Sequence, residues 1–356
     1  AVFFAAFLIV KRFLENEDKR REHDLNKGNQ SITSPLRLQA YERIIIFLER
    51  INPSSLLVRV NKNGMNCHQF HMELIKTIKS EFEHNLSQQI YMSHASWELI
   101  KTTKEEIVEN WLPRYTGRDL ADFTPYILLT NFSQYLQLFS EMYQVPIMGE
   151  GKPMQSVSAN GITIINFGMG SAMAATVVDL LSAINPKAVL FLGKCGGLKK
   201  KNKIGDLVLP IAAIRGEGTS NDYFPAEVPA LPSFALQKAI STSIRELALD
   251  YWTGTVYTTN RRIWEHDEVF KEYLIKLRAM AIDMETATIF ITGFHNEIPT
   301  GALLLVSDQP MIPEGVKTSE SDIMVSANFV KNHLAVGIRS LEQLINNGQT
   351  VKHLQF

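Results

Sequence analysis

Three apolar runs in the middle of the chain are each followed by glycines. The runs are Ile162–Phe167, Ala188–Leu192 and Asp206–Ile214. Between the first two, apolar residues recur at helical spacing from Met173 to Ile184, and Asn185-Pro186 ends this pattern. Strand, helix and strand with glycine at each carboxyl end predict a parallel α/β sheet, with a ligand site along that edge.

The glycine turns are themselves candidate ligand-binding segments. They are Gly168-Met169-Gly170, Gly193-Lys194-Cys195-Gly196-Gly197 and Arg215-Gly216-Glu217-Gly218. Glycines let backbone N–H groups approach a ligand, and the helix that begins at Ser171 would favour an anion at its N-terminus. A nicotinamide dinucleotide is not favoured, because position 173 is methionine where the fingerprint needs glycine.

Hydrophobic patterns also predict the other elements of this part of the chain. Strands are expected at 126–130, 253–258 and 301–306, a short hairpin at 148–160, and helices ending near 143 and spanning 233–247, 264–277, 281–293 and 321–346. The loop 219–232 is rich in proline and acidic residues. It is long for a structureless connection, which favours a binding loop.

The first 104 residues are different and predict an all-helical module. Apolar positions at helical spacing indicate helices at 34–51, 70–86 and 95–111. Residues 1–10 are wholly apolar and are followed by Lys11-Arg12. Ten residues are fewer than the ~20 that span a bilayer. The run is either the second half of a membrane helix, with the rest of the chain in the cytoplasm, or a signal-like or buried helix end.

Composition limits the classes of function. The chain has 356 residues, of which 45% are hydrophobic and 21% charged, so a globular core and two domains are expected. A net charge of −1 argues against a general nucleic-acid binder. With only two cysteines, at 67 and 195, no disulfide framework forms, which fits a reducing cytosol. Cys67, His68 and His71 lack a second cluster to complete four metal ligands, so a half-exposed helix end is favoured there.

Two carboxylates occupy positions that suit catalysis. Asp308 follows apolar residues at the end of a predicted strand, where partial burial would raise its pKa and suit it to be a general acid. Glu285 lies in AIDMETA, at the start of a predicted helix. The alternatives are a turn or capping aspartate at 308 and a glutamate at 285 that only compensates the helix dipole.

Four strings, in this order, resemble the nucleoside phosphorylase/nucleosidase superfamily. They are Gly168-Met169-Gly170, Gly193-Lys194-Cys195-Gly196-Gly197, Asp283-Met284-Glu285-Thr286-Ala287 and Val306-Ser307-Asp308. The longer strings RGEGTSNDYFP, VYTTNRRIWEHD and LLLVSDQPMIP resemble the AMP nucleosidase family within it. The resemblance covers about residues 106–344 and implies a nucleoside phosphorylase-like mixed sheet flanked by helices, in a catalytic domain at 105–356. Residues 1–104 resemble an uncharacterised helical, membrane-anchored family.

The resemblance implies hydrolysis of the N-glycosidic bond of AMP to adenine and ribose 5-phosphate. Asp308 matches the family's acid at N7 of the base, and Glu285 matches its ribose ligand, with Met284 packed beneath that glutamate. Water would take the place that phosphate has in the phosphorylases. The alternatives are a purine nucleoside phosphorylase or thionucleosidase of the same fold, and a non-catalytic nucleotide sensor that signals at a membrane.

Further substrate contacts are expected on the same edge of the sheet. They are Gly168, Gly170, Lys194, Gly196, Arg215, Glu217, Tyr223, Arg261 and Arg262. The four basic residues are the candidates for binding the 5′-phosphate, and the sequence does not decide among them; Arg215 and Arg262 are preferred for their bidentate geometry.

The same comparison bears on co-substrates and partners. Phosphorylases place Arg and Ser around a Gly-Ser-Cys-Gly turn, whereas Phe191 and Lys194 stand there in this chain, so a phosphate co-substrate is not expected. Neither a metal nor a cofactor is required by the chemistry. The family assembles as homo-oligomers, and a cytoplasmic location is expected, tethered to the inner face of the membrane if residues 1–10 are an anchor.

Overall fold

The computed structural model describes residues 30–50, 108–312, 315–316 and 318–347, with scattered positions between 56 and 80. The chain divides into two compact units, residues 1–106 and 107–356. In the first unit, helix α2 spans Gln30–Arg50 and includes the segment predicted to be helical from 34. The apolar run 1–10, the cluster 67–71 and most of the helices predicted at 70–86 and 95–111 lie outside the described residues.

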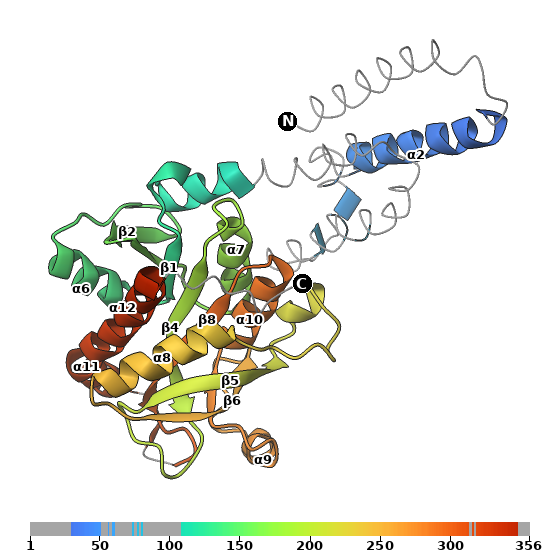
Figure 1. Ribbon diagram of the computed structural model, residues 1–356. Coiled ribbons are helices and arrows are strands. Elements are labelled where there is room, and N and C mark those ends of the chain that lie inside the picture. The colour runs from blue at the N-terminus through green and yellow to red at the C-terminus, as the bar shows by residue number, and fades with distance from the viewer. Residues whose placement is uncertain are drawn as a thin grey trace. The chain divides into compact units, whose positions relative to one another are not determined.

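The second unit alternates strands and helices (Figure 1). Its strands are β1 (Tyr126–Thr130), β2 (Gln155–Ala159), β3 (Ile162–Asn166), β4 (Ala188–Gly197), β5 (Leu207–Gly216), β6 (Tyr251–Thr259), β7 (Ala281–Asp283) and β8 (Thr300–Asp308). Its helices are α6 (Ser133–Tyr143), α7 (Ser171–Leu181), α8 (Phe234–Glu246), α9 (Glu268–Lys276), α10 (Thr286–His295), α11 (Ser319–Asn328) and α12 (Val330–Asn347), with short 3₁₀ helices η2 (Leu120–Asp122) and η3 (Thr219–Asp222). Residues 108–116 are also helical.

The described strands form one mixed sheet in the order β2-β3-β1-β4-β7-β6-β5-β8, with a further pairing of β4 with β8. Strand β1 pairs in parallel with β3 and β4, and β4 pairs in parallel with β8. Three pairs are antiparallel: β2 with β3, β4 with β7, and β5 with β8. The extra pairing closes β4, β7, β6, β5 and β8 into a ring. The mixed sheet implied by the resemblance is therefore confirmed, and the parallel arrangement predicted from the apolar runs holds for β3, β1 and β4 but not for the whole sheet.

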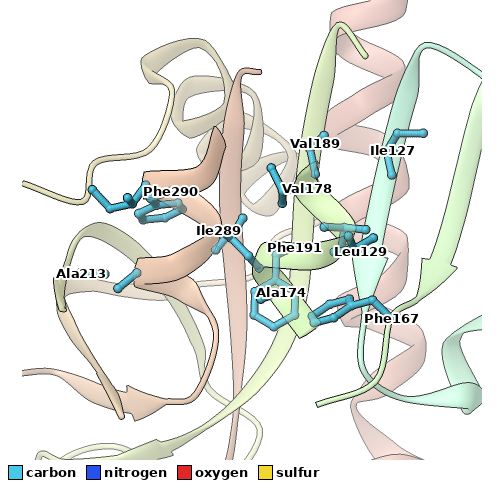
Figure 2. Close-up of a cluster of buried hydrophobic side chains, with 14 of the residues drawn as sticks. Ile127, Leu129, Phe167, Ala174, Val178, Val189, Phe191, Ala213, Ile289 and Phe290 are labelled. Carbon is cyan, nitrogen blue, oxygen red and sulfur yellow. The ribbon is translucent and has the colours of Figure 1, made fainter. Parts of the chain in front are cut away.

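Alternate residues of the central strands face two separate cores, because successive side chains of a strand point to opposite faces. Ile127 and Leu129 of β1 belong to the core that α7 and α10 cover, and Leu128 belongs to the core beneath α6, α8 and α12. Figure 2 shows part of the first core, where Val178 of α7 lies near Phe191 of β4. Apolar residues thus fill both faces, which explains the continuous apolar runs in the sequence.

The glycines predicted to form a turn after the second apolar run instead continue strand β4. A Cβ at Gly196 would lie 3.0 Å from Pro310 Cγ, and a Cβ at Gly197 would lie 2.9 Å from Asn202 Cβ. These glycines therefore permit close packing of neighbouring segments against a buried strand. The expected turn at 193–197 is wrong for this physical reason.

Three other boundaries differ from the predicted ones. Residues 281–283 form β7, so the helix expected from 281 begins at Thr286. The single helix expected at 321–346 is two helices, α11 and α12. The expected hairpin is made by β2 with β3, across a turn in which Asn160 and Gly161 both have positive φ.

Candidate active site

A pocket opens where the carboxyl ends of several strands meet. It is lined by Asn131, Phe132, Met169, Lys194, Cys195, Gly196, Thr259, Arg261, Arg262, Trp264, Glu265, Ile282, Asp283, Met284, Glu285, Ser307 and Asp308. These residues lie at or just beyond the ends of β1, β6, β7 and β8, in the last part of β4, and in the connection from β3 to α7. The location agrees with the ligand site predicted at this edge of the sheet.

Glu285 is the most deeply buried carboxylate that the resemblance assigns to catalysis. It is 2% exposed and is the residue immediately before α10. Its Oε1 accepts hydrogen bonds from Gly170 N at 2.7 Å and from Asn131 Nδ2 at 3.3 Å. Gly170 precedes α7 and has a φ of 92°, which favours glycine. One carboxylate oxygen therefore joins the start of α7 to the end of β1.

Burial, and then the nearby charge of Asp283, raise the pKa of Glu285 to about 8. Hydrogen bonds from Gly170, Met284 and Asn131 act in the opposite direction, because they favour the ionised form. A cation in the pocket would lower this pKa, since opposite charges stabilise each other. The protonation of Glu285 is thus poised to respond to positive charge on a bound ligand.

Asp283 holds the backbone around Glu285 in place. It is buried, and its Oδ1 accepts a hydrogen bond from Thr258 Oγ1 at 2.7 Å. Its Oδ2 accepts from Thr286 N at 2.8 Å, from Thr286 Oγ1 at 2.5 Å and from Glu285 N at 3.3 Å. Burial raises the pKa of Asp283, and these hydrogen bonds oppose that shift. The aspartate caps the N-terminus of α10, which fixes the position of the glutamate.

Asp308 is the last residue of β8 and is half-buried at the pocket wall. Ser307 Oγ donates a hydrogen bond to Asp308 Oδ1 at 2.6 Å. The serine is buried, so this hydrogen bond restricts the orientation of the carboxyl group. The pocket thus combines a strand-end carboxyl group with the helix-start carboxyl group of Glu285.

Lys194 lies in the pocket wall, but acidic and polar groups of α11 surround its ammonium group. Its Nζ donates to Asp322 Oδ1 at 2.9 Å and to Ser326 Oγ at 3.1 Å. The ammonium also lies 4.3 Å from the centroid of the Phe132 ring. The lysine side chain is 4% exposed. Asp322 therefore offsets much of the positive charge that Lys194 brings to the pocket.

Arg261 and Arg262 line the pocket from the loop that follows β6. Arg261 Nη2 lies 2.8 Å from Asp267 Oδ2, and its guanidinium lies over the Phe270 ring. The Phe270 amide and then Arg261 lower the pKa of Asp267. Arg262 Nη1 lies 3.7 Å from Glu265 Oε1. Arg261 is the more firmly held of the two.

Five of the expected substrate contacts are not among the residues that line this pocket: Gly168, Gly170, Arg215, Glu217 and Tyr223. Arg215 donates hydrogen bonds to Ser220, Asn221, Phe224, Pro225 and Val228 of the following loop. Arg215 thus holds the loop through five acceptors of the chain, and the phosphate contact preferred from the sequence stays a prediction.

Glu217 and Tyr223 connect the same loop to the helices of the first core. Glu217 Oε1 accepts from Ser220 N at 3.1 Å and from Thr288 Oγ1 of α10 at 2.8 Å. Tyr223 OH donates to Asp179 Oδ2 of α7 at 2.5 Å. The loop expected to bind a ligand is therefore attached to α7 and α10.

The glycines and the methionine of the expected site differ in whether they line the pocket. Gly196 and Met284 line it, and Gly170 contacts it through the hydrogen bond to Glu285. Gly168 donates its N–H to Asn166 Oδ1 at 3.2 Å and is not among the lining residues.

Asn131, Asp283, Thr259 and Trp264 line the pocket and were not expected to be site residues. Asn131 directly follows the strand predicted at 126–130, so the strand-end rule applied to Asp308 would have selected it too. Asp283 stands within the quoted string DMETA. The other two have no distinguishing sequence signal, because Thr259 ends a strand and Trp264 packs against Phe270 in a local apolar cluster.

Two further observations concern the described residues only. Within them, no group of three or more His, Cys, Asp or Glu side chains is arranged to hold a metal ion. No described helix combines the length and apolarity needed to cross a bilayer. Membrane attachment through residues 1–10 and assembly into homo-oligomers stay predictions.

With the pocket and the sheet described, comparison with protein families defines the class. The model of the phosphorylase superfamily matches residues 126–342, and the chain belongs to this superfamily. A family of unknown function (DUF7935) matches residues 1–112. The expected division of resemblance between the two parts of the chain is confirmed.

Comparison with individual proteins narrows the superfamily to AMP nucleosidases as relatives of this chain. The chain is 30% identical over 284 residues to AMP nucleosidase of Escherichia coli K12, which covers 67% of this chain and 58% of that protein. It is 60% identical to the crystal structure of AMP nucleosidase from Bacteroides thetaiotaomicron, with a TM-score of 0.63, covering 69% of this chain and 99% of that one. These matches confirm the resemblance to AMP nucleosidases. The chain spans 58% of the length of the curated E. coli relative.

More distant relatives share the superfamily. Uridine phosphorylase of Treponema pallidum is 27% identical and covers 52% of this chain and 73% of its own length. A crystal structure of uridine phosphorylase from Vibrio fischeri, 23% identical with a TM-score of 0.57, covers 63% of this chain and 94% of that one and shares the fold.

Proposed function

We propose that the chain hydrolyses the N-glycosidic bond of AMP and releases adenine and ribose 5-phosphate. The observation that carries this proposal is the 60% identity to an AMP nucleosidase structure over 99% of that chain. The pocket supports it with two carboxyl groups, Asp308 and Glu285, on different elements of its wall. We also propose that residues 105–356 form the catalytic domain, because the pocket-lining residues lie between 131 and 308.

In this proposal, Asp308 is the general acid. Breaking the bond between the sugar and adenine leaves negative charge on the base, and a proton at N7 neutralises it. The strand-end position and the Ser307 hydrogen bond at 2.6 Å would hold the Asp308 carboxyl group in one orientation. An acid held in place in this way typically contributes about 10²–10⁴-fold to a rate.

Glu285 would bind the ribose. Its Oε1 is held by Gly170 N and Asn131 Nδ2, while Oε2 accepts a hydrogen bond of 3.3 Å from Met284 N. The carboxylate has acceptor capacity left for the ribose hydroxyls. As the sugar becomes cationic, the ionised form of Glu285 would be stabilised and would in turn stabilise the sugar. A buried and fixed carboxylate is effective here because it does not reorganise during the reaction.

Arg262 is our choice for the 5′-phosphate. Its distance of 3.7 Å to Glu265 is longer than a charge-assisted hydrogen bond, and its side chain is 57% exposed. Exchange of this partner for a phosphate oxygen therefore loses little. Lys194 is a weaker candidate, because Asp322 and Ser326 already accept from its ammonium group.

Product analysis tests the proposal. The purified full chain is incubated with AMP, adenosine or 5′-methylthioadenosine, each with and without inorganic phosphate, and free adenine and the sugar product are separated by chromatography. We expect adenine and ribose 5-phosphate from AMP without added phosphate. Release that needs phosphate would indicate a phosphorylase, preference for methylthioadenosine a thionucleosidase, and no release a binding protein.

A further inference from the structure

Asn131 presents an unusual buried acceptor at the pocket wall. It is the first residue after β1 and lines the pocket together with Phe132 and Glu285. Its Nδ2 donates to Glu285 Oε1 at 3.3 Å. Its Oδ1 is buried and accepts no hydrogen bond from the residues that the structure describes.

An acceptor in this state is costly unless a ligand or a water supplies a donor. A buried polar atom without a partner costs about 1–3 kcal/mol, so each one calls for an explanation, such as a bound water or a catalytic role. Of the described atoms in this state, Asn131 Oδ1 is the one that belongs to a pocket-lining residue. Rotation of the amide would not help, because it would place Oδ1 against the carboxylate of Glu285. The backbone is also fixed, because Thr130 pairs with Asn166 on one side and with Leu192 on the other.

We propose that Asn131 Oδ1 accepts a hydrogen bond from the water molecule that attacks C1′ of the sugar. The inference rests on the proposed function and adds a residue that binds the nucleophile. Water has two O–H donors, and the amide oxygen lies next to the amide nitrogen that contacts the Glu285 carboxylate. One water can therefore donate to Asn131 Oδ1 and to Glu285 together, which leaves a lone pair for the sugar carbon.

The step balances with groups already in the pocket. The C1′–N9 bond breaks, its electron pair goes to adenine, and adenine takes a proton at N7 from Asp308. The water oxygen forms the new bond to C1′ and releases one proton to the Glu285 carboxylate. Exchange with solvent then returns Asp308 to its acid form and Glu285 to its ionised form. Asn131 transfers no proton, since an amide is a poor base, and only orients the water.

Asn131→Leu tests the inference, because leucine has nearly the same size and no acceptor. The matched control is Asn328→Leu, at an exposed position of α11 whose amide bonds to its own helix. With AMP, we expect kcat of Asn131→Leu to fall on the order of 10²–10³-fold, as for other single lost polar contacts to a reacting group, with KM changed only a few-fold. The control retains its kcat.

Folding is checked by the thermal midpoint. We expect Asn131→Leu to be no less stable than the unmutated chain, because the unpaired acceptor is removed together with the hydrogen bond to Glu285. If this variant does not fold, Asn131→Ala is used in its place and is expected to show the same loss of kcat. Normal turnover by a folded Asn131 variant, with an active unmutated chain, would overturn the inference and leave the proposed function intact.

A partition experiment separates water binding from a structural role. Methanol has one O–H donor and cannot satisfy both acceptors, so the unmutated chain should favour water over added methanol. We expect the ratio of methyl ribose 5-phosphate to ribose 5-phosphate to rise in Asn131→Leu, and an unchanged ratio would contradict the inference. A kcat deficit that disappears with 2′-deoxy-AMP would assign Oδ1 to the 2′-hydroxyl and would also overturn it. If the unmutated chain releases no adenine from AMP, the proposed function itself has failed.

Discussion

Strands β5 and β6 pair in parallel, and Gly216 at the end of one lies opposite Thr259 at the end of the other. An arginine stands near each end: Arg215 in β5 and Arg262 in the loop after β6. Arg215 is surrounded by five acceptors of its own loop, whereas Arg262 lies 3.7 Å from one carboxylate of the described residues, that of Glu265, and lines the pocket. A cation that is fully hydrogen-bonded within the chain stabilises the fold, and one that is loosely paired beside a pocket can serve a ligand.

The two loops also differ in what they attach to. The loop after β5 is fixed to α7 and α10 through Tyr223 and Glu217. The loop after β6 is held locally, by Arg261 with Asp267 and by Trp264 packed on Phe270. Ile263 between these anchors is 74% exposed. The first loop thus supports the helices that position Glu285, while the second presents side chains to the pocket.

The variant expected to lose the most activity is one at Asp308. The role given to the loop after β6 requires a substrate in the pocket, and Asp308, at the end of β8, is the acid proposed to act on that substrate. Asp308→Asn should lower kcat for adenine release from AMP by about 10²–10⁴-fold and largely spare AMP binding. The matched control is Asp179→Asn, which loosens Tyr223 of the loop after β5. The control should lower the thermal midpoint and reduce kcat far less than Asp308→Asn does, because Asp179 supports α7 without lining the pocket. Turnover near that of the unmutated chain in Asp308→Asn would remove Asp308 from the mechanism.

Glu285→Gln should have the next largest effect on turnover. The side chain keeps its size and loses its negative charge, and that charge matters most once the sugar is cationic. We therefore expect kcat to fall by roughly 10²–10³-fold, a larger change than the rise in KM. Steady-state kinetics with AMP measure both. If only KM rises, Glu285 binds substrate and transition state equally.

The same variant tests the raised pKa of Glu285. The unfolded chain releases this proton near the ordinary pKa of 4.5, and the folded chain keeps it until about pH 8. The folded state therefore binds more protons in this window, and the stability contributed by Glu285 falls as pH rises from about 4.5 to about 8. Relative to the unmutated chain, Glu285→Gln should gain thermal stability over this range. A stability difference that is independent of pH would contradict the shift.

The sequence predicts most of the sheet because strands buried on both faces have continuous apolar runs. Strand β1 and helix α6 end where the pattern places them, at Thr130 and Tyr143. Strand β7 escapes prediction because its three residues are too few for a period-2 pattern. The glycines of β4 mislead because they are required by packing, against Pro310, which is distant from Gly196 in the sequence, and against Asn202 in the turn that follows the strand. Pairing direction depends on such distant contacts as well, so the antiparallel pairs could not be inferred from local patterns.

The candidate site, like the sheet, was predictable from the sequence only in part. Glu285, Asp308 and Met284 line the pocket because they stand at element ends, which a sequence pattern can locate. The direction of a long charged side chain cannot be read from its position. Arg215 and Lys194 were expected to face a phosphate, and the acceptors that hold them come from the following loop and from α11. Asn131 follows a predicted strand, so its place at this edge could have been read from the sequence, whereas its contact with Glu285, 154 positions away, could not.

Arg262→Met tests the proposed phosphate contact directly, because methionine keeps the apolar length of the side chain and removes the charge. Loss of a charged hydrogen bond to phosphate should cost about 1.5–3 kcal/mol, or about 10- to 150-fold in kcat/KM for AMP. Adenosine has no phosphate, so its kcat/KM should change little. The thermal midpoint should also stay constant, because the Arg262 side chain is 57% exposed and its distance of 3.7 Å to Glu265 is long. Equal losses on both substrates would argue against a phosphate contact.

Arg215→Met should give the opposite profile and the smallest effect on catalysis. Three backbone carbonyls, those of Phe224, Pro225 and Val228, lose their donor, which costs at most about 1–3 kcal/mol each and less where solvent reaches them. We expect a lower thermal midpoint and faster proteolysis within 219–232, with the ratio of kcat/KM for AMP to that for adenosine unchanged. Because this loop contacts α7 and α10, both rates can fall together if the helices shift. A selective loss on AMP with an unchanged thermal midpoint would instead place Arg215 at the phosphate. The two loops would then have the same role, and the number of acceptors around an arginine would not distinguish them.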